Sequence, residues 1–241
     1  MLIMFSKNDL RKDLENLQIA PSDTLLIHSS MKSIGEVDGG ADAVLDMLMD
    51  YFKDSGLLLF PTLSYRSVNA GITRFDVANT PACTGILPEL FRKKPGVVRS
   101  LHPTHSLAAF GSDAENFVAG HEKANTPAPV GSPWWKILQK KGKIMFIGTG
   151  INCNTFLHGV DEWLNLPGLL TEHVEDLEIV DYNGKVIKSP QHRHCAGRNG
   201  YYESLESRFE AAGAMVRGKF GNANVQVLEA EKISAELGYT I

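Results

Sequence analysis

One histidine in the segment GINCNTFLHGVDEW has two carboxylates close behind it. Asp161 lies three residues after His158, and Glu162 lies four residues after it. On a helix, both offsets bring a carboxylate near the imidazole on one face. A carboxylate raises the pKa of a neighbouring imidazole and can fix its tautomer, as a general base requires. The alternative is a surface His–acid pair that contributes only about 0.2–0.5 kcal/mol to stability.

A hydroxyl-rich loop, HSSMKSIGEVDGG, begins at His28, between a predicted strand and a predicted helix. Ser29, Ser30 and Ser33 stand in it together with Lys32. Amides and hydroxyls at such a strand-to-helix connection can bind phosphate, and the lysine adds a positive charge. The segment is neither a Walker loop nor GxGxxG. A plain polar loop before a helix is therefore the alternative.

A third polar group precedes a strand of small residues in RSLHPTHSLAAFG. It contains Arg99, Ser100, His102, His105 and Ser106. Polar side chains gathered at a strand edge often face a ligand cleft in α/β folds. The alternative is a proline-containing loop whose histidines hydrogen-bond nearby carbonyl groups.

The segment QHRHC brings His192, His194 and Cys195 together. Side chains at i and i+2 project to one side of an extended segment, as in part of a metal site. No second Cys or His pair stands at the spacing typical of zinc sites, so we expect no bound metal. A single histidine that completes an active site is favoured, and a small metallohydrolase using His192 and His194 is the alternative.

Strands and helices must alternate to position these groups. Ser6 and Asp9 resemble a capping box that begins a first helix. The sequence predicts buried strands at 24–28, 57–60, 107–110 and 143–147, and helices at 41–54, 87–94, 133–140 and 153–164. Strands separated by helices of this size favour an α/β fold. We therefore expect a mixed sheet with parallel sections, flanked by helices.

The C-terminal third has a different pattern. An Asn-Gly pair between the apolar runs 174–180 and 185–188 predicts an antiparallel hairpin. A helix is expected at 200–212, followed by a final strand and helix. No linker divides the chain, so 1–241 is expected to form a single domain.

The composition is that of an ordinary soluble protein. Of 241 residues, 43% are hydrophobic and 22% are charged, and the net charge is −4. This mild acidity argues against nucleic-acid binding. The apolar runs are too short to span a membrane, and the first residues do not read as a signal peptide. Three cysteines without a CxxC pair favour a reducing, cytoplasmic location.

Three segments resemble the aminoglycoside 3-N-acetyltransferases, a family of antibiotic acetyltransferases unrelated in fold to the GNAT acetyltransferases. They are LLIHSSMKSIGEVDGGADAVLDML, FDVANTPACTGILPELFRKKPGVVRSLHPTHSLAAFG and GSPWWKILQKKGKIMFIGTGINCNTFLHGVDEW. They follow one another between residues 24 and 163, and the C-terminal third matches more loosely.

The resemblance implies a mixed α/β architecture, acetyl-CoA as cosubstrate and acetylation of the 3-amino group of an aminoglycoside. His158 matches the family's catalytic histidine. The remaining matched positions would bind the cofactor: Ser29, Ser30, Met31, Lys32, Ser33, Ile34, Ser100, His102 and Ser106. Direct transfer by general-base catalysis is expected, with Thr62 and Ser64 as possible donors to the oxyanion.

The sequence departs from the family at two places. Family members usually have Glu three residues after the histidine, whereas this chain has Asp161 and then Glu162, so either acid can be the partner. The segment 192–202 also differs from the aspartate-rich stretch that helps form the antibiotic pocket. A same-fold acetyltransferase for a different amine and a non-catalytic CoA-binding protein are therefore alternatives. The protein is expected to be a monomer or a homodimer.

Overall fold

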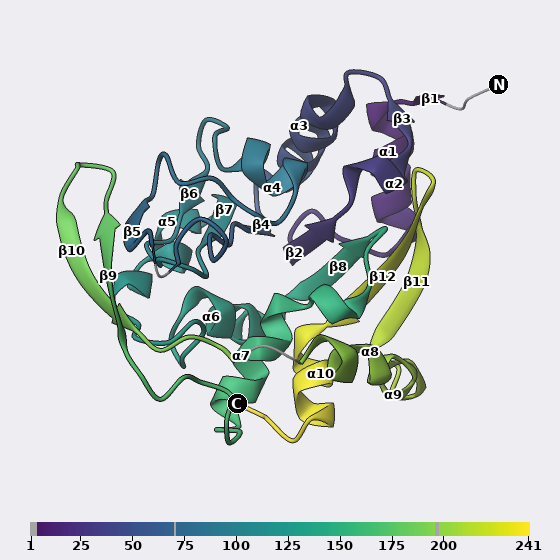
Figure 1. Ribbon diagram of the computed structural model, residues 1–241. Coiled ribbons are helices and arrows are strands. Elements are labelled where there is room, and N and C mark those ends of the chain that lie inside the picture. Colours follow the sequence, from purple (N-terminus) through teal and green to yellow (C-terminus); the bar gives the residue numbers. More distant parts are fainter. Residues whose placement is uncertain (1–3, 70, 196–197) are drawn as a thin grey trace.

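A seven-stranded mixed sheet forms the centre of the molecule (Figure 1). The computed structural model describes residues 4–69, 71–195 and 198–241. In sheet order the strands are Met215–Phe220 (β11), Ala223–Glu229 (β12), Lys143–Ile147 (β8), Thr24–Ser29 (β2), Leu57–Pro61 (β4), Leu107–Gly111 (β7) and Val98–Arg99 (β6). Strand β2 is parallel to β4 and β8, and the outer pairs are antiparallel. The expected mixed sheet with parallel sections is confirmed.

The carboxyl ends of the three parallel strands meet at one edge of this sheet. Ser29 pairs with Ile147 in register, and β4 ends nearby at Pro61. Because β7 runs antiparallel and pairs its first residue, Leu107, with Pro61, the turn before β7 lies at the same edge. Ligands of open α/β sheets bind outside such carboxyl ends.

Helices cover both faces of the sheet. Lys7–Asn16 (α1), Gly40–Phe52 (α3) and Ile86–Phe91 (α4) pack on one face, and Ala114–Val118 (α5), Pro133–Gln139 (α6), Thr155–Trp163 (α7), Glu206–Ala211 (α9) and Ala230–Glu236 (α10) on the other. Strand alternation separates the two cores. In β8, Ile144 and Phe146 join one cluster, whereas Met145 and Ile147 join the other.

A smaller sheet stands beside the first (Figure 1). The hairpin Glu175–Val180 (β9) and Val186–Gln191 (β10) is antiparallel, as the Asn-Gly pair predicts, and Arg74–Asp76 (β5) adds a parallel strand. Near the hairpin turn, the Tyr182 hydroxyl accepts a hydrogen bond from the Arg99 amide at 2.9 Å. The hairpin is thereby fixed to the main sheet.

Local sequence signals located the longer elements to within a few residues. The capping box is confirmed, since the Ser6 side chain accepts from the Asp9 amide and the Asp9 carboxylate accepts from the Ser6 amide. Predicted helix 200–212 is instead two helices, Asn199–Ser204 (α8) and α9. Strand β11 was not predicted, because this edge strand has exposed charged side chains and an internal glycine.

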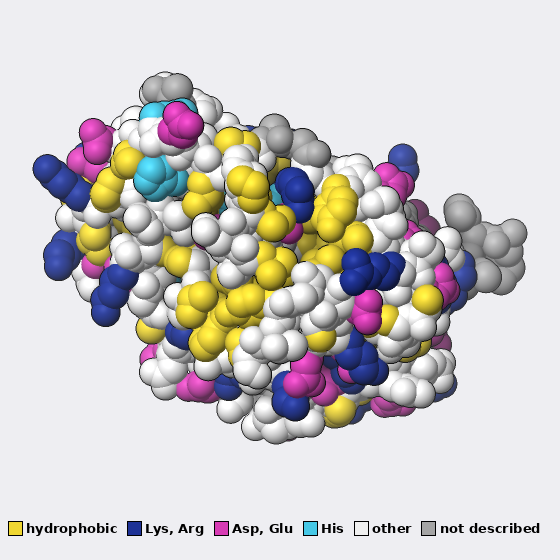
Figure 2. All heavy atoms as spheres, turned by 90° about the horizontal axis from the view of Figure 1, so that it is seen from below, with side chains coloured by type: hydrophobic (Ala, Val, Ile, Leu, Met, Phe, Trp, Pro, Cys, Tyr) yellow, Lys and Arg dark blue, Asp and Glu magenta, His cyan; other side chains and the backbone are white. Residues whose placement is uncertain are grey.

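On the face that Figure 2 shows, positive and negative side chains are mixed, and neither charge predominates. Hydrophobic side chains gather across the middle of that face, with basic and acidic side chains interspersed around them. Among the described residues, no helix has the length and apolar character needed to cross a membrane.

Candidate active site

A cavity of about 640 Å³ lies at the carboxyl edge of the parallel strands. Its walls come from the end of β2, the segments that follow β4 and β8, the turn before β7, helix α7 and the segment after β10. Its polar lining includes His28, Ser29, His105, Thr149, His158 and His194. The position is the one that the sheet topology favours for a ligand.

Helix α7 carries His158 into this cavity. The Asn154 side chain caps the helix by accepting from the Phe156 amide at 3.1 Å. The Nδ1 atom of His158 lies 3.0 Å from the Tyr202 hydroxyl oxygen. That hydroxyl donates to Asp161 Oδ2 at 2.6 Å, because a carboxylate only accepts. Tyr202 therefore accepts from the His158 Nδ1–H, which leaves Nε2 as the basic nitrogen.

Asp161 connects this pair to a cation. The Arg198 guanidinium holds it with two hydrogen bonds, each of 3.0 Å, in a forked geometry. Only 1% of Asp161 is exposed, so Arg198 supplies the charge that a buried carboxylate needs. The bond to Asp161 raises the pKa of Arg198, and burial followed by that same carboxylate raises the pKa of Tyr202. Arg198, Asp161, Tyr202 and His158 thus form one hydrogen-bonded chain.

Glu162 serves a different histidine. Its Oε1 atom accepts from His194 Nε2 at 2.6 Å and from the Ala128 amide at 2.7 Å. The His194 ring stacks on the His158 ring, with centroids 4.9 Å apart and an interplanar angle of 26°. Neither carboxylate hydrogen-bonds directly to His158, because Tyr202 lies between Asp161 and the ring and Glu162 is paired with His194. The catalytic roles of Asp161 and Glu162 stay predictions.

The electrostatic expectation for His158 is also corrected. Burial, with the nearby His194 and Arg198, lowers the pKa of His158 to about 3 instead of raising it. The ring is therefore neutral at physiological pH and able to accept a proton.

The loop after β2 contributes to two adjoining hollows. Ser29 lines the main cavity, and Ser33 lines a second hollow of about 430 Å³ formed with the turns around Gly148 and Asn222. Thr149 lines both, so the two hollows adjoin. The Ser33 hydroxyl also donates to the Ser30 hydroxyl at 3.0 Å.

The remaining loop positions differ from one another. Lys32 is exposed, and Met31 is partly buried against the core beneath α1 and α3. Ile34 is fully buried in that core, and its carbonyl accepts from the Asn222 amide at 2.9 Å. Helix Met31–Ile34 (α2) places the Ile34 side chain in the core, and its role in cofactor binding stays a prediction.

Ser100, His102 and Ser106 are buried behind the cavity wall and do not line it. The His102 Nδ1 atom accepts from the Thr104 and His105 amides at 3.2 and 2.9 Å, and its Nε2–H donates to the Thr126 carbonyl at 3.1 Å. Their role as cofactor-binding residues stays a prediction, and none of the three lines this cavity. Their hydrogen bonds are internal and shape the turn that presents Thr104 and His105 to the cavity.

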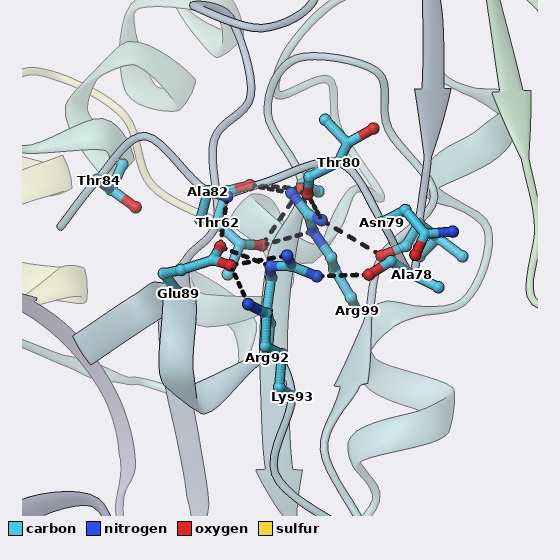
Figure 3. A network of polar contacts seen from close by, with 12 residues as sticks. Thr62, Ala78, Asn79, Thr80, Ala82, Thr84, Glu89, Arg92, Lys93 and Arg99 are labelled. Atoms are coloured by element: carbon cyan, nitrogen blue, oxygen red, sulfur yellow. Dashed lines mark hydrogen bonds and ion pairs between the residues drawn. The ribbon is translucent and has the colours of Figure 1, made fainter. Parts of the chain in front are cut away.

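Behind this wall lies a buried guanidinium (Figure 3). Arg99 is 2% exposed and donates to Thr62 Oγ1, Ser106 Oγ and the carbonyls of Thr62, Val77 and Thr80. Burial lowers its pKa to about 9, which leaves it charged at neutral pH. These bonds fasten the segment after β5 to the end of β4.

An ion pair between Arg92 and Glu89 lies beside that network (Figure 3). Arg92 donates two hydrogen bonds of 2.7 and 2.8 Å to the Glu89 carboxylate and one of 2.6 Å to the Ala78 carbonyl. Burial alone would raise the pKa of Glu89, but hydrogen bonds from Arg92, Lys93 and the Ala82 amide lower it to about 2.

Thr62 and Ser64 are unsuited to bind an oxyanion. Both are fully buried. The Thr62 hydroxyl is engaged by Arg99 and Ser106, and the Ser64 hydroxyl donates to the Pro103 carbonyl at 2.6 Å. Their prediction as donors at the reacting carbonyl is therefore wrong.

The histidines of the QHRHC segment have separate partners. His192 Nδ1 contacts the Thr171 carbonyl at 2.7 Å, whereas His194 bonds to Glu162. Within the described part of the chain, no group of three or more His, Cys, Asp or Glu side chains could hold a metal ion.

Five residues of the cavity lining have a buried polar side-chain atom with no hydrogen-bond partner among the residues that the structure describes. The atoms are His28 Nε2, Ser29 Oγ, Thr149 Oγ1, His194 Nδ1 and both Nε and Nη2 of Arg193, of which Nη2 lies in an ion pair with Glu175. An unpartnered buried polar group costs about 1–3 kcal/mol. Their concentration in one cavity therefore indicates a place that binds a polar ligand. His28 and Thr149 were missed from sequence because they lie at the ends of apolar strands.

Comparisons with known proteins agree with this geometry. The family model for aminoglycoside 3-N-acetyltransferase matches residues 26–238. The aminoglycoside N(3')-acetyltransferase-like protein YokD of Bacillus subtilis is 25% identical, over 92% of this chain and 87% of that protein. Aminoglycoside N(3)-acetyltransferase VII of Streptomyces paromomycinus is 28% identical, over 73% of this chain and 67% of that protein.

Solved structures share the fold. AAC-IIIb bound to CoASH superposes with a TM-score of 0.83 at 24% identity and covers 97% of this chain and 95% of that one. A variant of aminoglycoside acetyltransferase AAC(3)-IVa in complex with a gentamicin gives a TM-score of 0.84 at 23% identity, over 98% and 88%. The expected fold, distinct from that of the GNAT acetyltransferases, is confirmed, and the chain belongs to the aminoglycoside 3-N-acetyltransferase family.

Proposed function

We propose that this enzyme transfers the acetyl group of acetyl-CoA to a primary amine, with His158 as general base. The observation that carries the proposal is the fixed tautomer of His158. Tyr202 holds its Nδ1–H at 3.0 Å, so Nε2 is unprotonated on a ring that lines the cavity. A base with one nitrogen anchored and the other free is the arrangement that proton abstraction needs.

In this mechanism the amine nitrogen attacks the thioester carbonyl while His158 Nε2 removes its proton. The imidazolium that forms is stabilised through Tyr202 by the Asp161–Arg198 pair. When the C–S bond breaks, His158 returns the proton to the departing sulfur. Ser29 and Thr149, whose hydroxyls have no partner within the described residues, are candidate donors to the CoA portion or to the developing oxyanion.

The 3-amino group of an aminoglycoside is the first acceptor to test. Relatives carry the name aminoglycoside N(3)-acetyltransferase, and similar structures hold a gentamicin or sisomicin. We infer the same acceptor class here from family membership.

A different amine is the second candidate, because the described lining of the cavity contains no Asp or Glu. Carboxylates next to lining residues already have partners, since His194 holds Glu162 and Arg193 holds Glu175 at 2.7 Å, and Arg198 holds the neighbouring Asp161. A polycation gains most from unpaired carboxylates, so an acceptor with fewer charges suits this cavity better.

The deciding experiment is acetyl-CoA turnover, read as free thiol, against aminoglycosides and simple primary amines. Turnover of aminoglycosides supports the first acceptor, and turnover of monoamines alone supports the second. CoA binding by calorimetry without turnover of any amine favours a CoA-binding protein and overturns the proposal.

Replacing His158 by Ala tests the assigned base. Loss of general-base catalysis should lower kcat by about 10²–10⁴-fold while the affinity for CoA stays unchanged. Near-normal turnover would exclude His158 as the base. A single domain over 1–241, a cytoplasmic location and a monomeric or dimeric state stay predictions.

A further inference from the structure

His194 is a second imidazole of the cavity that is held by an acid. Its side chain is 7% exposed, and that of its partner Glu162 is 5% exposed. The 2.6 Å contact joins His194 Nε2 to a carboxylate oxygen, which only accepts. The hydrogen therefore sits on Nε2, and Nδ1 keeps a free lone pair. No described residue hydrogen-bonds to that Nδ1.

The two imidazoles lie together and are anchored in opposite senses. His194 stacks on His158 with a centroid distance of 4.9 Å, and both line the same cavity. Tyr202 and Asp161 anchor His158 through Nδ1, whereas Glu162 anchors His194 through Nε2. Two of the four imidazoles that line this cavity thus have one nitrogen fixed and the other unprotonated.

Amide formation from an ammonium ion requires two proton removals. The ammonium loses a first proton to become a nucleophile, and the nitrogen loses a second as the C–N bond forms. The second proton goes to sulfur when the C–S bond breaks, and the first is released to solvent. A lone base would have to discharge the first proton before taking the second.

We propose that His194 takes the first proton from the incoming ammonium at Nδ1, and that His158 takes the second at Nε2. This division of labour rests on the proposed function. Glu162 stabilises the imidazolium that His194 becomes, in the way a buried carboxylate supports a catalytic histidine. His194 then passes its proton to solvent before His158 takes the second, so that the two stacked rings are not charged at the same time.

Few ionisable groups face His194. Glu162 alone makes a direct hydrogen bond to it within the described residues. The rings of His158 and His105 contact it, the latter at 5.3 Å and 76°. The other nearby groups are His102 and the Arg193–Glu175 and Arg198–Asp161 pairs. Since both arginines are compensated by acids, Glu162 dominates the charge around His194.

The test compares pH profiles of kcat/KM for the amine in His194→Gln and Glu162→Gln. The control variant is His173→Asn, because the His173 side chain is 70% exposed. At pH 7 we expect His194→Gln to lose about 10²-fold, with KM for acetyl-CoA unchanged. The loss should shrink below about 10-fold near pH 10, because a primary amine with a pKa of about 10.4 then deprotonates in solution. Glu162→Gln should show the same trend with a smaller loss, and His173→Asn the wild-type profile.

The outcomes separate the two proposals. A loss that is equal at every pH, or wild-type kinetics in His194→Gln, overturns the role of His194 and leaves the proposed function standing. If thermal melting shows that His194→Gln does not fold, a wild-type pH profile in Glu162→Gln overturns it instead. Wild-type enzyme that turns over no amine overturns the proposed function and this role with it.

Discussion

The histidine cavity and the Arg99 network lie on either side of one wall, yet their polar groups are satisfied differently. The Arg99 guanidinium donates to five oxygens of the protein. In the cavity, by contrast, His28, Ser29, Thr149 and His194 each keep a polar atom without a partner among the described residues. Both regions are buried and both carry ionisable groups.

The difference separates structural polarity from functional polarity. A buried polar group that is fully hydrogen-bonded holds chain segments together, and removing one partner exposes the others to the cost of desolvation. A group left unpartnered gives up stability that a ligand can restore. Arg99 therefore stabilises the wall, whereas the cavity groups are available to bind a substrate.

The largest effect on stability should come from lowering the pH, because buried histidines lie in both regions. Burial is the first cause that lowers the pKa of His28, His102 and His158 to about 3 each. Below about pH 6.5 the unfolded chain binds protons at these histidines while the folded chain does not, so stability falls as pH falls towards 3. Between pH 7 and pH 5, each of these histidines should lower the free energy of unfolding by about 2 kcal/mol. Equal free energies of unfolding in urea at pH 7.5 and 5 would contradict this.

The next largest effect should come from Arg99→Met. The substitution leaves the Thr62, Val77 and Thr80 carbonyls without their donor, so the free energy of unfolding should fall by about 3–5 kcal/mol. Arg66→Met is the matched control, because Arg66 is exposed and should change stability by less than about 0.5 kcal/mol. Urea unfolding measures both. If Arg99→Met lowered the free energy of unfolding by less than about 1 kcal/mol, the hydrogen bonds of the wall would not be stabilising, and the contrast with the cavity would fail.

Tyr202→Phe should weaken catalysis without weakening CoA binding. The His158 Nδ1–H loses its acceptor, and the imidazolium loses its link to Asp161. We expect kcat to fall about 10–100-fold, with KM for acetyl-CoA unchanged. Steady-state kinetics distinguishes the two constants. A kcat within twofold of wild type would mean that Tyr202 does not position the base.

The smallest effects should come from a pair of serines. Ser100 accepts from the Leu107 amide at 2.8 Å, so Ser100→Ala should cost about 1–2 kcal/mol of stability and leave CoA affinity unchanged. Ser29 has no described partner for its hydroxyl, so Ser29→Ala should not lower stability and should weaken CoA binding by a few-fold. Urea unfolding and calorimetry measure these effects. Equal behaviour of the two variants would remove the distinction between satisfied and unsatisfied groups.

Much of the frame was predictable from local sequence. The capping box at Ser6 and Asp9 and the Asn-Gly hairpin both formed as expected. The strand and helix alternation also predicted a mixed sheet with parallel sections, flanked by helices. Short strands such as β6 were missed, because two residues carry too little periodicity to detect.

The sequence by itself determined the longer elements and the place of His158 on its helix, because helical hydrogen bonds and side-chain spacing join residues only a few positions apart. The partners of that histidine were decided by tertiary structure alone. Tyr202 lies 44 residues from His158 in the chain, and Glu162 pairs with His194 at a separation of 32. Such contacts depend on how the sheet edge and the segment after β10 are packed together, which no local spacing encodes. Tertiary packing likewise buried Ser100, His102 and Ser106 behind the wall and left Ser29 facing the cavity.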